Sequence, residues 1–214
     1  MNAALVTAVY DSYDSLKPFA LQDVGVDAVC VTDDPDLACE GWRVVYEPRL
    51  GVHPNRAAKA PKMCPWRYTT ADCSVWVDAS FRISSPTFVR DALGFADPIA
   101  QFVHWDRDCI YEEVLASVPL VKYLGEPLEQ QIRDYQSRGH PTHWGLWATG
   151  LIARRHTGPM MMFGQSWLSE CEHWSYQDQV SQPVVFREMG LRPETIPGTY
   201  SQNPWIVYEG SGRH

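Results

Sequence analysis

The chain has 214 residues, of which 45% are hydrophobic, and a formal net charge of −8 from 18 basic and 26 acidic side chains. Such a length and composition fit one globular domain with a substantial core, and the acidity argues against a general nucleic-acid binder, whose affinity for phosphates comes from basic groups. The apolar runs are too short to span a bilayer and the N-terminus has no secretory signal, so we expect a cytoplasmic protein with reduced cysteines and no membrane contact.

Short apolar runs bounded by turn residues predict a series of buried strands. We expect six, with a weaker seventh as the last of the series: residues 3–9, 28–32, 43–47, 74–77, 99–104, 149–153 and 159–163. Helices are predicted between them, around 86–94, around 110–118, and from Pro127 to Gly139. Alternating strands and helices predict a single-domain α/β protein, a three-layer α/β/α sandwich around a central, mostly parallel (mixed) sheet. The domain is expected to span residues 1–197, followed by a loosely packed tail over 198–214.

A basic segment precedes the fourth predicted strand. It contains five cations and no acid: Arg49, Arg56, Lys59, Lys62 and Arg67. The three central cations are three residues apart, so a helix would place them along one broad face, where Arg and Lys side chains can bind phosphates. The alternative is a solvated basic helix face.

The fourth predicted strand contains Trp76 and ends on Asp78. In α/β proteins ligands bind beyond the carboxyl ends of strands, and Mg²⁺ or Mn²⁺ is commonly held by one or two carboxylates together with substrate phosphates. An acid here, beside a basic segment, predicts a metal-bridged diphosphate. His156, at the end of the sixth strand, could complete the metal site. The alternatives are an Asp that caps a turn and a structural His.

Residues 165–179, QSWLSECEHWSYQDQ, concentrate three carboxylates, one His and two Trp. Trp rings are platforms on which sugar faces stack, and a carboxylate here could act in catalysis, with Asp178 or Glu170 the candidates. Ser175 and Asp178 have the spacing of a weak capping box. The alternative is an ordinary helix with Trp side chains in the core.

The segments HPNRAAKAPK, WVDAS, FVHWDRDCIYEE, RRH and SWLSECEHWSYQDQVS occur in one order along the chain. In this combination the sequence resembles the turgor-regulation-defect and mucilage-related glycosyltransferase-like domain family, which is also found in bacteria and phages. The resemblance covers most of the chain, from about Val6 to about Val185. It implies a GT-A fold that binds a nucleotide-diphosphate sugar, with a UDP sugar as the expected donor, and a divalent cation, Mn²⁺ or Mg²⁺.

The resemblance also suggests roles for individual residues. Asp78 looks like the metal-site acid, although Ser80 stands where the wider fold has the second acid of an Asp-x-Asp motif. Asp178 and Gln179 match the acid–amide pair that faces the sugar. The residues expected to bind the nucleotide sugar are Thr7, Tyr10, Asp11, Arg56, Lys59, Lys62, Trp76 and Gln179.

The expected reaction is metal-assisted transfer of a hexose to a hydroxyl group of a glycan, a protein or a hydroxymethylated DNA base, by a monomer or small homo-oligomer. Two other functions stay open. One is a non-catalytic sugar- or nucleotide-binding module on the same fold, which Ser80 would favour. The other is a metal-dependent lipid-amide hydrolase, although the sequence has no His-rich zinc signature.

Overall fold

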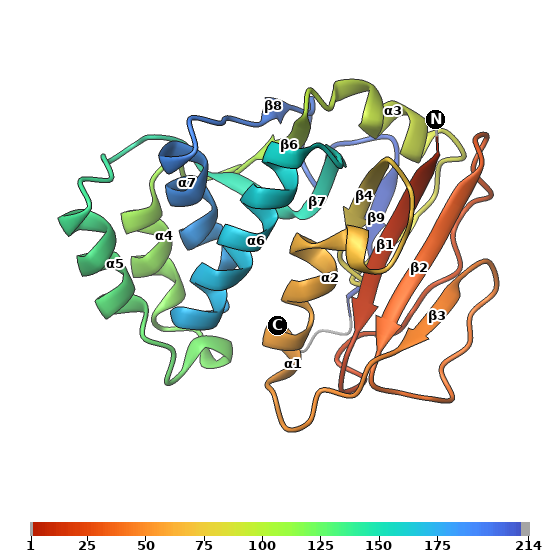
Figure 1. Cartoon of the computed structure of the whole chain (residues 1–214), viewed down its shortest axis with the longest axis horizontal. Coiled ribbons are helices and arrows are strands. Elements are labelled where there is room, and N and C mark those ends of the chain that lie inside the picture. The colour runs from red at the N-terminus through yellow and green to blue at the C-terminus, as the bar shows by residue number, and fades with distance from the viewer. Residues whose placement is uncertain (1, 211–214) are drawn as a thin grey trace.

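The computed structural model describes residues 2–210, which form one α/β unit (Figure 1). The strands of this part of the chain are β1 (Ala3–Val9), β2 (Val26–Thr32), β3 (Arg43–Tyr46), β4 (Cys73–Val77), β5 (Phe81–Ile83), β6 (Ile99–Val103), β7 (Trp147–Arg155), β8 (Glu194–Thr195) and β9 (Ile206–Tyr208). The helices are α1 (Pro54–Ala57), α2 (Lys59–Met63), α3 (Phe88–Phe95), α4 (Ile110–Ser117), α5 (Leu128–Ser137), α6 (Gly158–His173) and α7 (Asp178–Glu188), with short 3-10 turns η1 (Pro65–Arg67) and η2 (Val121–Tyr123).

Seven strands form the central sheet, in the order β3-β2-β1-β4-β7-β6-β8. The pairs β3–β2, β2–β1 and β1–β4 are parallel, whereas β7 runs antiparallel to both β4 and β6. The mostly parallel GT-A-like sheet predicted from the sequence is thus confirmed. The carboxyl ends of β1 and β2 reach the lower edge of the sheet in Figure 1, beside α1. Because β7 is reversed, its amino-terminal part comes to this same edge, and Val77 of β4 faces Leu151.

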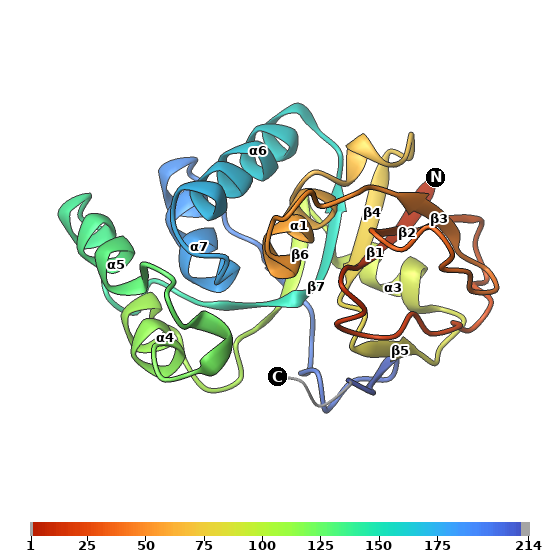
Figure 2. The same cartoon turned by 90° about the horizontal axis from the view of Figure 1, so that it is seen from below.

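Helices cover both faces of the sheet, which confirms the three layers (Figure 2). Ala4 and Val6 of β1 belong to the core cluster that includes α2, α6 and α7, whereas Ala3 and Leu5 belong to the cluster with α3 and the small β5–β9 sheet. Strands buried on both faces are continuously apolar, which is why short runs of the sequence predicted them. The longest described helix, α6, has 16 residues, and no helix in the described residues combines the length and apolar character needed to cross a membrane.

The predicted strand at 159–163 is wrong, because these residues form the first turns of α6. Thr157 caps this helix by accepting a hydrogen bond from the Met160 backbone, and Pro159 lies in its first turn, where no backbone N–H is needed. A short apolar run does not by itself distinguish a buried strand from a buried helix.

The expectation of a loose tail is also wrong for residues 198–210. Strand β9 pairs with β5, and Trp205 and Ile206 are buried in the core on the α3 side. Tyr200 packs against Phe81 and Phe102. The remainder of the tail, residues 211–214, lies outside the described residues. No apolar run predicts this packing, because the segment is rich in polar and turn-forming residues.

Helices α2 and α6 approach each other closely at Gly164. A Cβ atom at this position would lie 2.2 Å from the Met63 carbonyl oxygen and 2.5 Å from the ring of Trp66, so only glycine fits without movement of the α2 backbone. This contact helps to set the position of α2 relative to α6. Two of the lysines predicted to bind phosphate, Lys59 and Lys62, lie on α2.

We therefore expect Gly164→Ala to lower the free energy of unfolding by about 1–3 kcal/mol, the usual cost of overpacking. The matched control is Gly94→Ala in α3, where an added Cβ meets no atom within 4 Å and the helix should gain up to about 1 kcal/mol. Chemical denaturation of both variants measures the difference. Equal stability of the two variants would contradict the close approach of α2 and α6.

Candidate active site

A cleft of about 210 Å³ opens at the carboxyl edge of β1 and β4, between α2 and the η2–α7 side of the molecule. Its charged lining residues are three acids and three lysines: Asp14, Asp78, Asp178, Lys59, Lys62 and Lys122. Its aromatic lining residues are Tyr10, Tyr13, Trp76, Tyr123 and Tyr176. A concave site with a few convergent charges, at the end of parallel strands, is the arrangement in which α/β proteins bind ligands.

Asp78 follows directly after β4 and its side chain is 40% exposed. Its Oδ1 accepts a hydrogen bond from Trp76 Nε1 at 2.7 Å and lies 3.6 Å from the Lys62 ammonium. Its backbone N–H donates to the Gly150 carbonyl of β7. A Cβ at Gly150 would lie 2.9 Å from Asp78 Oδ2, so glycine at this position leaves room for the carboxylate. Asp78 is thus held in orientation and still reaches the cleft.

Asp178, the first residue of α7, is the centre of a buried ion cluster. Its Oδ2 lies 2.8 Å from the Lys59 ammonium and 2.7 Å from that of Lys62, and its Oδ1 accepts a hydrogen bond from the Thr149 hydroxyl at 2.8 Å. Burial opposes the charge on this carboxylate, but the two lysines outweigh burial and hold the pKa of Asp178 well below its usual range. A carboxylate this acidic is a poor proton acceptor. Its geometry favours a role in positioning the lysines over that of a general base.

Lys122 is the third lysine of the cleft, and it lies on η2. Its ammonium lies 5.0 Å from the centre of the Tyr123 ring. Burial, followed by repulsion from Lys59, lowers its pKa. In the part of the chain that the structure describes, no carboxylate lies within ion-pair distance of this ammonium, whereas Lys59 and Lys62 are both paired with Asp178. Lys122 is therefore the cation of the cleft best placed to bind an arriving anion.

Comparison with known proteins identifies the family of this chain. The sequence profile of the TOD1/MUCI70 glycosyltransferase-like domain matches residues 26–197. The chain belongs to this family. A search of the curated proteins finds no match. The match covers most of the chain, confirms the resemblance found in the sequence, and suggests that the protein is a glycosyltransferase.

In this glycosyltransferase-like domain, seven of the twelve predicted site residues line the cleft: Tyr10, Lys59, Lys62, Trp76, Asp78, Asp178 and Gln179. Two of them also make contacts at its walls. The Tyr10 hydroxyl donates to Glu47 at 3.0 Å, and the Gln179 amide donates to the Trp147 carbonyl at 3.2 Å. The structure therefore brings these seven residues together at one cleft, and their roles stay predictions.

Three residues predicted to bind the nucleotide sugar lie elsewhere. Arg56 does not line the cleft and donates to the carbonyls of Cys171 and Trp174 and to Glu126. Positions three apart on a helix are offset by about 60° per step, so Arg56 and Lys62 differ by about 120° in direction. Asp11 pairs with Arg49 outside the cleft.

Thr7 is the third. It is buried in β1 on the face opposite α2, beside Phe19 and Trp42, and its hydroxyl makes no hydrogen bond within the described chain. A strand turns alternate side chains to opposite faces, so the neighbour of Thr7 in sequence, Ala8, reaches the cleft instead.

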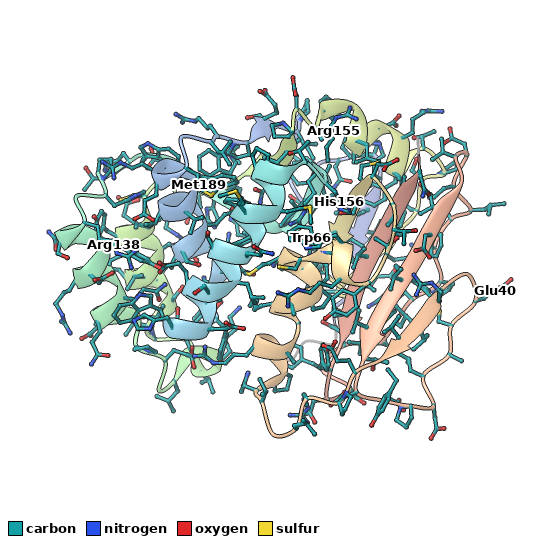
Figure 3. The ribbon with its side chains drawn as sticks, viewed as in Figure 1. Glu40, Trp66, Arg138, Arg155, His156 and Met189 are labelled. Atoms are coloured by element: carbon teal, nitrogen blue, oxygen red, sulfur yellow. The ribbon has the colours of Figure 1, made fainter. Side chains whose placement is uncertain are left out.

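The predicted pairing of His156 with Asp78 at one metal site is wrong. His156 follows the carboxyl end of the antiparallel β7, at the opposite end of β4, and its ring lies beside Trp66 (Figure 3). Its Nδ1 donates to the Ala71 carbonyl at 2.7 Å, and its Nε2 accepts from the Ser74 hydroxyl at 2.9 Å. Burial lowers the pKa of His156 to about 4, so it is a neutral, structural side chain.

Glu170 is not in the cleft, contrary to its predicted catalytic role. It lies on the side of α6 that faces α5, where it accepts hydrogen bonds from the Tyr135 hydroxyl at 2.7 Å and from Arg138 at 2.9 Å. The predicted capping box is wrong too. Gln177 precedes α7, and the Ser175 hydroxyl donates to Gln131 instead.

Lys122, Tyr123 and Thr149 also line the cleft, although no sequence pattern predicted them there. No motif marks the segment that contains Lys122 and Tyr123. These residues reach the site because α4 packs against α7 and Tyr123 packs against Tyr176, just before α7. The one signal was the position of Thr149 at the start of a predicted strand. Its importance depends on the reversed direction of β7, which a local pattern does not reveal.

Asp178→Asn should lower the free energy of unfolding by about 3–5 kcal/mol, since it leaves two lysines beside a neutral group in a buried site. Because the folded-state pKa of Asp178 is depressed, its contribution to stability is complete above the unfolded-state pKa of about 3.9 and is lost as the pH falls toward the folded-state value. Urea denaturation at pH 7 and at pH 3 measures both effects.

The control for this prediction is Asp178→Asn combined with Lys62→Met, which removes one of the two uncompensated charges. The double variant should recover part of the lost stability. A single variant within about 1 kcal/mol of the wild type at pH 7 would contradict the role of the ion cluster.

Proposed function

We propose that this protein transfers a hexose from a nucleotide-diphosphate sugar, with UDP as the expected nucleotide, to an acceptor hydroxyl group. The observation that carries this proposal is the cleft in which the exposed carboxylate of Asp78 faces Lys62 and Lys122 at the carboxyl edge of the sheet. A diphosphate needs cations, and the lysines supply them within a globally acidic protein. Membership of a glycosyltransferase-like family supports the same activity.

The walls of the cleft suit the other parts of such a donor. Tyr10, Tyr123 and Tyr176 offer aromatic surfaces against which a nucleobase or a sugar ring can pack. Gln179 and Ser80 offer polar groups for the sugar hydroxyls. In this arrangement the diphosphate lies between Lys122 and Lys62, and the sugar points toward Asp78.

The family's fold implies a divalent cation, and Asp78 is the residue that would hold it. Its Oδ2 is not engaged in any of the hydrogen bonds or ion pairs of the described side chains, and oxygen ligands of this kind suit Mg²⁺ and Mn²⁺. Such an ion would supply positive charge to the departing diphosphate. With Ser80 in place of a second acid, the phosphate oxygens would have to complete its coordination.

The residues of the chain would promote transfer mainly through electrostatics. Negative charge grows on the diphosphate as its bond to the sugar breaks, and Lys62 and Lys122 can neutralise it. Asp178 fixes the position of Lys62 and so prepares this environment before the donor arrives. Because the charged side chains of the buried ion cluster are already in position, they need not rearrange during the reaction.

A second candidate is a non-catalytic module that binds nucleotide sugars. The favouring observation is that Asp178, the best candidate for a general base in the sequence, is held by two lysines and Thr149. Turnover separates the two functions. Slow release of nucleoside diphosphate from the sugar nucleotide indicates an enzyme, whereas binding without release indicates the module.

The decisive first experiment is a thermal-shift screen of nucleotide sugars with and without Mn²⁺. We expect one donor to raise Tm by several degrees, with a larger shift when the metal is present, because a ligand stabilises the folded state by mass action. No shift with any nucleotide sugar, confirmed by calorimetry, would refute the proposed function.

Asp78→Asn should reduce donor hydrolysis and transfer at least a hundredfold while the fold stays intact, since the variant loses the charge that faces the cation and the sugar. Asp72→Asn is the matched control, because Asp72 is the exposed acid directly before the same strand, β4, and lies at its opposite end. Steady-state turnover and circular dichroism measure activity and fold. Unchanged turnover in folded Asp78→Asn would remove Asp78 from the mechanism.

Lys122→Met should weaken UDP binding about tenfold and leave uridine binding unchanged, because uridine lacks the diphosphate. Lys122→Arg retains the charge and should retain most of the affinity. Arg133→Met, at an exposed position of α5, controls for the loss of one positive charge from the protein. Isothermal titration measures all four proteins, and an equal loss of UDP and uridine binding would indicate a structural role for Lys122.

A further inference from the structure

A second cavity, of about 520 Å³, lies on the other side of Asp78 from the nucleotide cleft. Its lining residues are Asp78, Ser80, Phe81, Trp105, Thr199, Tyr200, Ser201 and Tyr208. Asp78 and Ser80 line both cavities, so the two spaces meet at the carboxylate of the proposed reaction. The volume is within the range of small-molecule sites, about 300–1,000 Å³.

The wall of this cavity is an ordered aromatic surface. Trp105 is 62% exposed, and its ring stacks on His104 at a centroid distance of 4.3 Å and an interplanar angle of 20°. The centre of the Tyr200 ring lies 6.0 Å from that of Trp105 and 4.8 Å from that of Phe81. The Phe81 ring in turn contacts the Tyr208 ring. A large, oriented and accessible aromatic surface inside a cavity is typical of a binding site.

The polar groups of the cavity define the chemistry of its ligand. Ser80, Thr199 and Ser201 contribute hydroxyl groups and Asp78 a carboxylate, and among residues 2–210 the lining includes no Lys or Arg. A nucleic acid would bring phosphates, which require cations for affinity. A neutral sugar brings apolar ring faces and many hydroxyl groups, which match aromatic rings beside Ser, Thr and Asp side chains.

We propose that this cavity is the acceptor subsite and that it binds a neutral glycan, with one sugar ring stacked on Trp105 and the reacting hydroxyl directed toward Asp78. The inference rests on the proposed function. In the transfer, the acceptor oxygen forms a bond to the anomeric carbon of the donor sugar as the bond between that carbon and the diphosphate oxygen breaks. The diphosphate leaves with the electron pair, and the hydroxyl proton is released to solvent.

Chain topology supports this assignment. The cavity wall comes from β5 and β9 and from the loop that contains Tyr200, and the Tyr200 hydroxyl accepts a hydrogen bond from the Gly150 backbone next to Asp78. Tyr200 therefore joins the wall of the second cavity directly to the reaction centre. A displacement of Tyr200 would therefore also displace the backbone at Gly150, beside Asp78.

The experiment uses the full chain and a panel of neutral probes, namely cello-, xylo- and malto-oligosaccharides and p-nitrophenyl glycosides. Calorimetry without donor measures glycan binding, and calorimetry with nucleotide sugar measures donor binding. Transfer assays then give the acceptor KM for the best probe. The variants are Trp105→Ala and Tyr208→Ala. The matched control is Tyr46→Ala, because Tyr46 also lies on a strand and is 55% exposed, against 54% for Tyr208.

We expect Trp105→Ala to weaken glycan binding and raise the acceptor KM about tenfold, with donor affinity and donor hydrolysis unchanged. Tyr208→Ala should act in the same direction, and Tyr46→Ala should change neither quantity. Glycan binding that is the same in Trp105→Ala and wild type overturns the subsite, as does the absence of binding by every neutral probe.

A further arm tests a different acceptor class with a single-stranded oligonucleotide that contains 5-hydroxymethylcytosine. Trp105-dependent binding of this oligonucleotide in place of the glycans overturns the proposal. Because glycan binding is measured without donor, failure of the subsite is distinguishable from failure of the proposed function, which would show as the absence of nucleotide-sugar binding in the wild type.

Discussion

The buried ion pairs of Asp178 with Lys59 and Lys62 are the interaction on which the site depends. They join α2 to α7 above the edge of the sheet, and Thr149 adds β7 to the same cluster. Two lysines buried without a carboxylate would be strongly unfavourable, so the three charges are stable only as a group. The cluster therefore sets the distance between two helices and, with it, the width of the cleft.

The reversed strand β7 supports this cluster at several points. Arg154, fully buried, donates hydrogen bonds to the carbonyls of Lys62 and Met63 at the end of α2. Gly150 leaves space for Asp78, and Thr149 reaches Asp178. The carboxyl-terminal part of β7 thus holds α2, and its amino-terminal part contacts two of the three acids of the cleft, Asp78 and Asp178. An all-parallel sheet would place the start of this strand at the opposite edge, away from the cleft.

The sequence predicted the elements whose signal is local. The apolar runs gave the central strands, and an acid directly after a strand placed Asp78 at the correct edge of the sheet. Lys59 and Lys62 line the cleft, yet Arg56 does not, and its guanidinium donates to Glu126 and to two backbone carbonyls instead. Positions three apart are offset by about 60° per step around a helix, so Arg56 and Lys62 differ by about 120° and need not share a narrow face.

The remaining features of the site depend on contacts between distant segments. His156 and Asp78 both stand at strand ends, but the direction of β7 decides that they lie at opposite edges, and no local pattern encodes that direction. Lys122 comes from a segment with no motif. Trp105 lies in the segment FVHWDRDCIYEE, but no local pattern shows that this segment reaches the side of Asp78. The second cavity forms only when β5 pairs with β9, because each strand contributes an aromatic residue to its wall. These strands are far apart in the sequence, and no local pattern predicts that they pair.

The pairing of β5 with β9 has a consequence for how the protein folds. Arg82 and Glu209, which pair across these strands, are 127 residues apart in the chain. Closing so long a loop costs entropy that is recovered only after the central sheet has formed, and contacts of this kind slow folding. The aromatic wall around Tyr200 is accordingly expected among the last parts of the molecule to assemble, so a partly folded chain could form the cleft between α2 and α7 before the second cavity exists.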